Sequence, residues 1–298
     1  MNPIRGILPA LATPFDAEGK FRPSSFELLL ERVYSAGVHG VYVCGQTGEG
    51  LLMPVAQRKA AAEVAVRNSP AGKSVVVHVG AHTTADAVEL VRHAASIGAA
   101  AISSLPPIGG YSFGEIRAYY EALAAASDLP LLVYFYPDAA PSVSTAAQVL
   151  ELCQIPGVIG LKFTDFDLYK METIKRQGVV LLNGRDEVLV AGLLMGADGG
   201  IGTFYNLVPE LFVQVYEHTA AGRWDAARAV QTRINELIRL VLRFPCLPAV
   251  KRMLAWSGID CGTCIAPRRE LTAEETGELA ALLGRSSFAS SAFASAGR

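Results

Sequence analysis

The stretch Gly157-Val-Ile-Gly-Leu-Lys-Phe-Thr164 places one lysine, Lys162, at the end of an apolar run. A short apolar run bounded by Pro156-Gly157 and Thr164-Asp165 is typical of a strand covered on both faces, as in the parallel sheet of an α/β protein. Lysine is rarely buried without a reason. Lys162 therefore points into the fold, or it ends the strand and extends its ammonium group into water.

These two positions of Lys162 predict different chemistry. Burial removes the ammonium group from water and lowers its pKa from the reference value of about 10.4. The neutral amine that results can attack a carbonyl carbon and form a Schiff base. A lysine that reaches water has no such role, and this segment alone leaves both interpretations open.

The composition favours a protein that binds a small molecule. The chain has 298 residues, of which 51% are apolar, and a net charge of −2. It can bury a large core without a metal or disulfide, and its balanced charge gives no electrostatic case for nucleic acid or a membrane surface. No run approaches the length of a membrane span, and prolines interrupt the N-terminal segment, which suits a first strand better than a signal peptide. We expect a cytoplasmic protein.

Cysteine and histidine spacing predicts no metal site or disulfide framework. The cysteines are odd in number and scattered, at Cys44, Cys153, Cys246, Cys261 and Cys264. The CxxC formed by the last two has no second CxxC and no histidine pair at ligand spacing, so free thiols are expected. His78 and His82 lack the glutamate of a metalloprotease helix.

Eight strand-like segments alternate with helical patterns. The strands are expected at Gly6–Ala12, Gly40–Cys44, Ser74–Val79, Ala100–Ser103, Leu131–Phe135, Val158–Phe163, Val179–Asn183 and Gly199–Thr203. The helices are expected at Ser25–Ala36, Val55–Asn68, Thr84–Ile97, Phe113–Ala126, Thr145–Leu152, Leu168–Arg176, Glu187–Met195 and Pro209–Ala220. Eight such units fit a (β/α)₈ TIM barrel, of class α/β, better than a doubly wound sheet.

The predicted organisation is one barrel followed by a helical extension. The barrel domain is expected over residues 1–222, and three helices, at Trp224–Arg243, Pro248–Trp256 and Thr272–Leu283, form an extension over 223–284. Residues 285–298 are a Ser/Ala-rich, low-complexity tail that we expect to be disordered.

Polar residues gather where the predicted strands end, which is where barrel enzymes place their chemistry. They are Gln46, Thr47 and Glu49 after strand two, Tyr134 in strand five, Lys162 and Thr164 at strand six, Gly184, Asp186 and Glu187 after strand seven, and Thr203 at strand eight. The Gly-rich turn around Thr47 either presents amides and a hydroxyl to a carboxylate or is a tight turn in which Glu49 caps the next helix. Tyr134 is either a core aromatic or a proton shuttle. Asp186 and Glu187 either cap a helix or bind substrate hydroxyl groups.

The chain resembles the N-acetylneuraminate lyase / dihydrodipicolinate synthase family of pyruvate-handling class I aldolases. The motifs that carry the resemblance are Leu11-Ala-Thr-Pro-Phe15, Gly45-Gln-Thr-Gly-Glu49, Tyr134-Phe-Tyr-Pro137, Gly160-Leu-Lys-Phe-Thr164 and Gly196-Ala-Asp-Gly-Gly-Ile-Gly202. The resemblance implies that Lys162 forms a Schiff base with pyruvate or another 2-keto acid and that Tyr134 relays protons. It further implies that Gln46 and Thr47 hold the keto-acid carboxylate, that no metal or organic cofactor is needed, and that the protein is a homotetramer.

Within the family, the chain is more similar to the N-acetylneuraminate lyases. The resemblance assigns Asp186, Glu187 and Thr203 to the hydroxylated part of a sugar 2-keto acid. Thr164 and Gly184 are also expected to bind the substrate. Synthases have an arginine two residues beyond the proline of Tyr-x-x-Pro, where this chain has Ala139. The alternatives are a 2-keto-3-deoxy sugar-acid aldolase or dehydratase, then a dihydrodipicolinate synthase, and outside catalysis a sugar-acid sensor.

Three residues depart from the family pattern. Gln46 stands where Ser or Thr is usual, and Phe204 stands where lyases commonly have a small hydroxyl residue. Tyr111 lies two or three residues late for the second, interfacial tyrosine of the family. These positions bear on the choice of substrate and on the proton relay.

Overall fold

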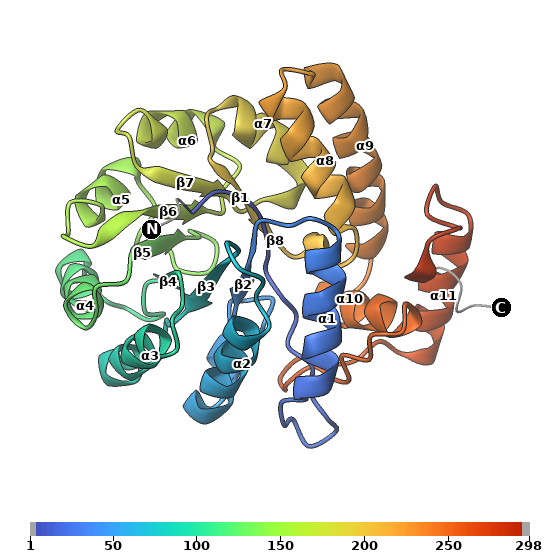
Figure 1. Ribbon diagram of the computed structural model, residues 1–298, viewed down its shortest axis with the longest axis horizontal. Coiled ribbons are helices and arrows are strands. Elements are labelled where there is room, and N and C mark those ends of the chain that lie inside the picture. Colours follow the sequence, from blue (N-terminus) through green and yellow to red (C-terminus); the bar gives the residue numbers. More distant parts are fainter. Residues whose placement is uncertain (1–3, 294–298) are drawn as a thin grey trace.

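Eight parallel strands form one sheet in the computed structural model, which describes residues 4–293 (Figure 1). The strands are β1 (Gly6–Pro9), β2 (Gly40–Val43), β3 (Ser74–His78), β4 (Ala101–Ser104), β5 (Leu131–Phe135), β6 (Val158–Phe163), β7 (Val180–Asn183) and β8 (Gly199–Gly202). Their order is β1-β8-β7-β6-β5-β4-β3-β2, and a parallel bridge between Ala10 and Tyr42 joins the two ends. The predicted TIM barrel is confirmed.

The helices that follow the strands cover the outside of the barrel (Figure 1). They are α1 (Pro23–Ser35), α2 (Val55–Arg67), α3 (Thr84–Ser96), α4 (Phe113–Ala125), α5 (Ala146–Leu152), α6 (Leu168–Lys175), α7 (Leu189–Leu194) and α8 (Pro209–Ala220). Several begin at hydroxyl caps; Ser112 and Thr145 each form a capping box with the residue three positions later. The helix expected at Glu187–Met195 starts later than predicted because Asp186–Val188 forms a separate 3₁₀ turn, η2. Two more 3₁₀ turns are η1 (Gly50–Leu52) and η3 (Phe204–Asn206).

Strand register decides which side chains enter the barrel. Lys162 on β6 pairs with Tyr134 on β5 and with Leu182 on β7. Residues that pair across a sheet share a face, and alternate residues along a strand face opposite sides. Tyr134 and Leu182 belong to the buried cluster inside the barrel, whereas Leu161 and Phe163 pack in the cluster beneath the helices. Lys162 therefore points inward.

Three further helices, α9 (Trp224–Val241), α10 (Cys246–Trp256) and α11 (Ala273–Gly284), form the extension. Figure 1 shows α9 alongside α8, α10 next to the barrel near α1, and α11 farther out. Within residues 4–293, no helix is both long and apolar enough to cross a membrane.

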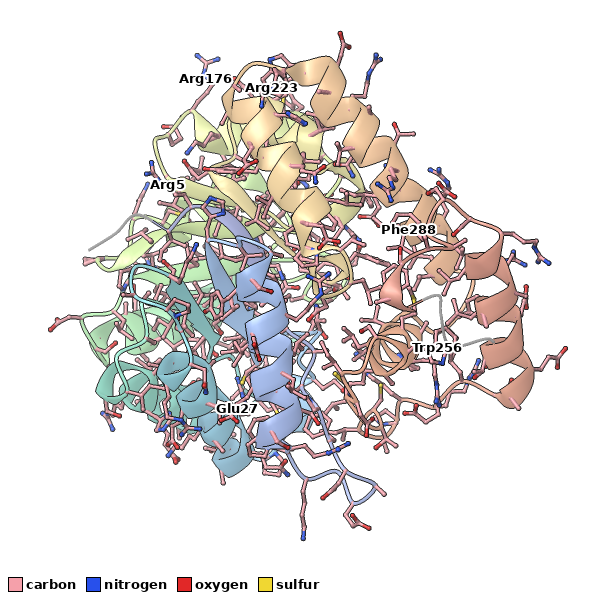
Figure 2. The ribbon with its side chains drawn as sticks, turned by 45° about the vertical axis from the view of Figure 1, so that its right-hand side comes forward. Arg5, Glu27, Arg176, Arg223, Trp256 and Phe288 are labelled. Atoms are coloured by element: carbon pink, nitrogen blue, oxygen red, sulfur yellow. The ribbon has the colours of Figure 1, made fainter. Side chains whose placement is uncertain are left out.

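The start of the C-terminal tail differs from the predicted disorder. The side chains of Phe288 and Phe293 are 1% and 5% exposed, and their ring centroids lie 6.1 Å apart. The Ser287 hydroxyl donates to Glu236 at 2.6 Å, and the Arg233 guanidinium lies 5.1 Å from the Phe288 ring. Figure 2 labels Phe288 on this part of the chain. Two phenylalanines supply apolar area that the Ser/Ala composition hides. Residues 294–298 of the predicted tail lie outside the described residues.

Candidate active site

A cavity of about 240 Å³ at the carboxyl ends of the strands brings together every residue that the sequence placed on one rim except Glu49. Its predicted lining residues are Gln46, Thr47, Tyr134, Lys162, Thr164, Gly184, Asp186, Glu187 and Thr203. Tyr136, Arg185, Ile201, Gly202, Phe204, Leu242 and Cys246 complete the lining.

Lys162 is buried in this cavity. Its side chain is only 4% exposed, and burial lowers the pKa of the amine to about 7, although the Asp186 carboxylate acts in the opposite direction. The Nζ atom lies 4.0 Å from the centroid of the Tyr134 ring and 4.7 Å from that of Tyr42. The interpretation in which Lys162 only reaches water is excluded, and burial favours the neutral form of the amine.

Tyr134 and Thr164 line the same cavity as the amine, and each carries a hydroxyl group. Burial raises the pKa of Tyr134, and the neighbouring Thr164 hydroxyl partly offsets this rise. Thr164 Oγ1 is buried without a well-formed hydrogen bond in the described part of the chain. A Cβ at Gly184 would lie 2.0 Å from this oxygen, so only glycine fits there. Gly184 therefore makes room for Thr164.

The turn after β2 joins the site to the extension. Thr47 Oγ1 lies 2.7 Å from Thr203 Oγ1, which ties the turn to the end of β8. Glu49 adopts a left-handed backbone, with φ of 56°, and its carboxylate accepts hydrogen bonds from Lys251 Nζ at 2.7 Å and from the backbone N–H of Ile265 at 2.8 Å. Helix α2 starts after Pro54, and no side chain of the described residues caps its N-terminus. The alternative in which Glu49 caps that helix is therefore wrong.

Asp186 and Glu187 have different environments. Asp186 is 6% exposed, and its Oδ2 accepts the backbone N–H of Phe204 at 2.7 Å. Burial raises the pKa of Asp186 to about 7. The Glu187 carboxylate makes no hydrogen bond or ion pair with the described residues, although it lines the cavity. Among the described residues, no side chain caps the N-terminus of α7. Helix capping therefore explains neither Asp186 nor Glu187.

Sequence reasoning missed several lining residues. Arg185 forms an ion pair with Asp138, and its guanidinium lies 4.4 Å from the Phe166 ring. It stands inside the motif that includes Asp186, so its position in sequence was a usable signal. Leu242 and Cys246 come from the extension, and no local pattern indicates that the extension reaches the rim. Tyr111 is exposed and does not line the cavity.

Comparisons with known proteins identify the family of the chain. Residues 3–286 match the model of the dihydrodipicolinate synthetase family. The N-acetylneuraminate lyase of Rhizobium meliloti strain 1021 is 35% identical over 282 residues, which cover 94% of this chain and 93% of that protein. The structure of CdNal from Clostridium difficile in complex with mannosamine aligns with a TM-score of 0.90 at 27% identity, over 94% of this chain and 98% of that one. A catalytic lysine mutant of the Ruminococcus gnavus sialic acid aldolase aligns with a TM-score of 0.90 at 28% identity, over 95% and 96% of the two chains.

The fold and these relatives define a class I pyruvate-dependent aldolase, which is a carbon–carbon lyase. The chain belongs to the dihydrodipicolinate synthetase family, and the family expected from the sequence is confirmed.

Proposed function

We propose that this protein cleaves or forms the bond between pyruvate and the aldehyde part of a sugar 2-keto acid, through a Schiff base on Lys162. The observation that carries the proposal is the buried amine, whose pKa is lowered to about 7 inside the cavity. A catalytic lysine in the similar Ruminococcus gnavus aldolase supports it.

The proposed reaction follows from the groups around Lys162. The neutral amine attacks the C2 carbonyl carbon, and loss of water gives an iminium that acts as an electron sink. Tyr134 takes the proton of the C4 hydroxyl while the C3–C4 electron pair moves towards the iminium, so that the aldehyde leaves and an enamine remains. Protonation of the enamine at C3 and hydrolysis release pyruvate. Because its pKa is raised, Tyr134 starts as a phenol. It therefore gives its own proton to the substrate carboxylate as it accepts the proton of the C4 hydroxyl, and the carboxylate then returns a proton to C3 of the enamine.

A hydroxylated sugar acid is the favoured substrate class. The uncommitted Glu187 carboxylate and the hydroxyl groups of Thr164 and Thr203 line the cavity beyond the amine. The similarity to N-acetylneuraminate lyases supports a substrate of that kind. A shorter 2-keto-3-deoxy sugar acid is the second candidate, because the Phe204 side chain occupies part of the lining.

The proposal extends to assembly and compartment. All five cysteines are free, which suits a reducing cytoplasm.

Three large apolar side chains are exposed on one part of the barrel's outer layer of helices and loops, and a homotetramer would cover them. They are Phe166, Tyr169 on α6 and Leu194 on α7. Light scattering in solution would test the oligomeric state.

Borohydride reduction in the presence of pyruvate tests the chemistry. The peptide that contains Lys162 should gain the mass of reduced pyruvate, and Lys162→Arg should abolish both the adduct and turnover while the protein stays folded. Tyr134→Phe should keep the fold and lower kcat by roughly 10²–10⁴-fold. An adduct on Lys251, which is held in the buried pair with Glu49, would contradict the mechanism.

A further inference from the structure

A second cavity, of about 440 Å³, opens beside the cavity that contains Lys162. The two share the lining residues Gln46, Thr47, Tyr136, Thr203 and Cys246. We call this second space the outer cavity. Ala139, with its small side chain, and the first turn of α10 form parts of its wall. Because the linings are shared, a ligand held at Lys162 can extend into the outer cavity.

The outer cavity is positively charged. Among the described residues, no Asp or Glu lines it, whereas Arg268 and Arg269 do. Arg269 is already paired, because its two terminal nitrogens each donate to an oxygen of Glu275 at 2.7 Å. The N-terminus of α10 lines the same wall and adds the positive end of its helix dipole. The described charged side chains of the outer cavity are therefore all cationic, whereas Asp186 and Glu187 line the inner one together with Lys162 and Arg185.

Arg268 carries a charge that is only partly neutralised. Its nearest carboxylate is that of Glu49, with 3.7 Å between Arg268 Nε and Glu49 Oε2. That carboxylate is already bonded to Lys251 and to the Ile265 amide. Within residues 4–293, the Arg268 guanidinium has no hydrogen-bond partner. Because Glu49 also pairs with Lys251, its carboxylate neutralises Arg268 only in part, and the N–H donors of the guanidinium stay available to a ligand.

The loop that carries Arg268 is anchored. Lys251 Nζ donates to the Thr263 carbonyl at 2.7 Å, the Ile265 N–H donates to Glu49, and the Cys264 N–H donates to the Glu270 carboxylate at 2.7 Å. Glu49 and Lys251 are no more than 2% exposed. The arginine therefore projects from a loop fixed by a buried ion pair, as a preformed anion site requires.

We propose that the outer cavity binds an anionic group, a phosphate or a carboxylate, carried at the far end of the aldehyde part of the substrate, with Arg268 as its main ligand. A guanidinium pairs with either oxyanion through two parallel hydrogen bonds. The inner cavity then takes the keto-acid end and the hydroxyl groups, and the outer cavity takes the second charge. This inference deepens the proposed function. Its turnover test rests on the proposed function, because the test measures addition of aldehydes to pyruvate.

The turnover test compares charged and neutral aldehydes in addition to pyruvate. Glyceraldehyde 3-phosphate is matched with glyceraldehyde, and succinic semialdehyde is matched with butanal. Arg268→Ala should lower kcat/KM for at least one charged aldehyde by about 10-fold or more and change the neutral partners less than about 2-fold. Arg268→Lys should recover part of the loss. The control is Arg252→Ala, which removes an exposed arginine of α10 that lines neither cavity.

A loss confined to the phosphate pair or to the carboxylate pair would identify which oxyanion the site takes. Equal losses for charged and neutral aldehydes, or none, would overturn the inference. Calorimetric titration of Lys162→Arg with inorganic phosphate separates the two proposals, because it needs no imine. Saturable binding that Arg268→Ala removes would keep the anion site even if pyruvate trapping failed. Trapping at Lys162 with no Arg268-dependent effect in either assay would reject the anion site alone.

Discussion

Lys162 and Asp186 influence each other's protonation inside the cavity. Burial lowers the pKa of the amine to about 7, and the Asp186 carboxylate favours the ammonium form. Only the neutral amine attacks a carbonyl, so the rate of adduct formation with pyruvate should rise with pH and pass its midpoint near 7. The two groups titrate as a coupled pair, so this midpoint belongs to both.

Asp186→Asn should move that midpoint to lower pH. The substitution removes the negative charge that stabilises the ammonium form, and it leaves burial as the dominant effect on the amine. Rates of borohydride-trapped adduct formation between pH 5 and 9 would measure the shift. Asp225→Asn, at an exposed position of α9, should leave the midpoint unchanged. A midpoint that rises in Asp186→Asn would show that another group controls the amine.

The preference for a long sugar acid depends on whether the Glu187 carboxylate binds substrate hydroxyl groups. If its free carboxylate binds hydroxyl groups, Glu187→Gln should cost about 1–3 kcal/mol in kcat/KM for a long sugar acid and spare imine formation with pyruvate. Thermal stability should change little, because the side chain caps no helix in the described structure. Turnover of N-acetylneuraminate and of 2-keto-3-deoxygluconate on one preparation is the measurement. Equal losses for both acids would remove the preference for the longer substrate.

At the scale of elements, the sequence predicted most strands and helices closely because each has a distinct local pattern. Val158–Phe163 is a continuous apolar run, and its bounds agree with β6. The η2 turn was missed because Asp186 and Glu187 suit the start of a helix, whereas Asp186 instead holds the Phe204 amide. The pairing of Glu49 with Lys251 had no local signal, since 202 positions separate the residues.

The Glu49–Lys251 pair should be a strong link between the turn after β2 and α10. Lys251→Met would leave a buried carboxylate unpaired and should destabilise the protein by about 3–5 kcal/mol in urea unfolding. Adding Glu49→Gln removes that charge and should recover part of the loss. Lys59→Met, which breaks a more exposed pair with Glu89, should cost less than about 1 kcal/mol. Similar losses in both single variants would mean that the buried pair is not the link proposed.

At the scale of the whole molecule, the alternation of strands and helices predicted the barrel. The barrel in turn predicted that the active site lies at the carboxyl ends of the strands. The strand ends then placed Tyr134, Lys162 and Thr203 together without any knowledge of their distances. What could not be predicted depends on how the extension packs. Leu242 and Cys246 line the inner cavity, and Arg268 the outer, only because the extension folds back over the strand ends.

The order of the residues after α11 also depends on tertiary packing, which their composition does not indicate. Phe288 is 1% exposed, and it packs near Phe293 and under the Arg233 guanidinium. Phe288→Ala should therefore create a cavity and destabilise the protein by about 3–5 kcal/mol, measured by urea unfolding. The kinetic constants should stay unchanged under native conditions, because residues 285–293 line neither cavity. Leu28→Ala, at a half-exposed position of α1, should cost less than about 0.5 kcal/mol. If Phe288→Ala is equally mild, the segment does not pack in solution, and the disorder expected from its composition would be the better description.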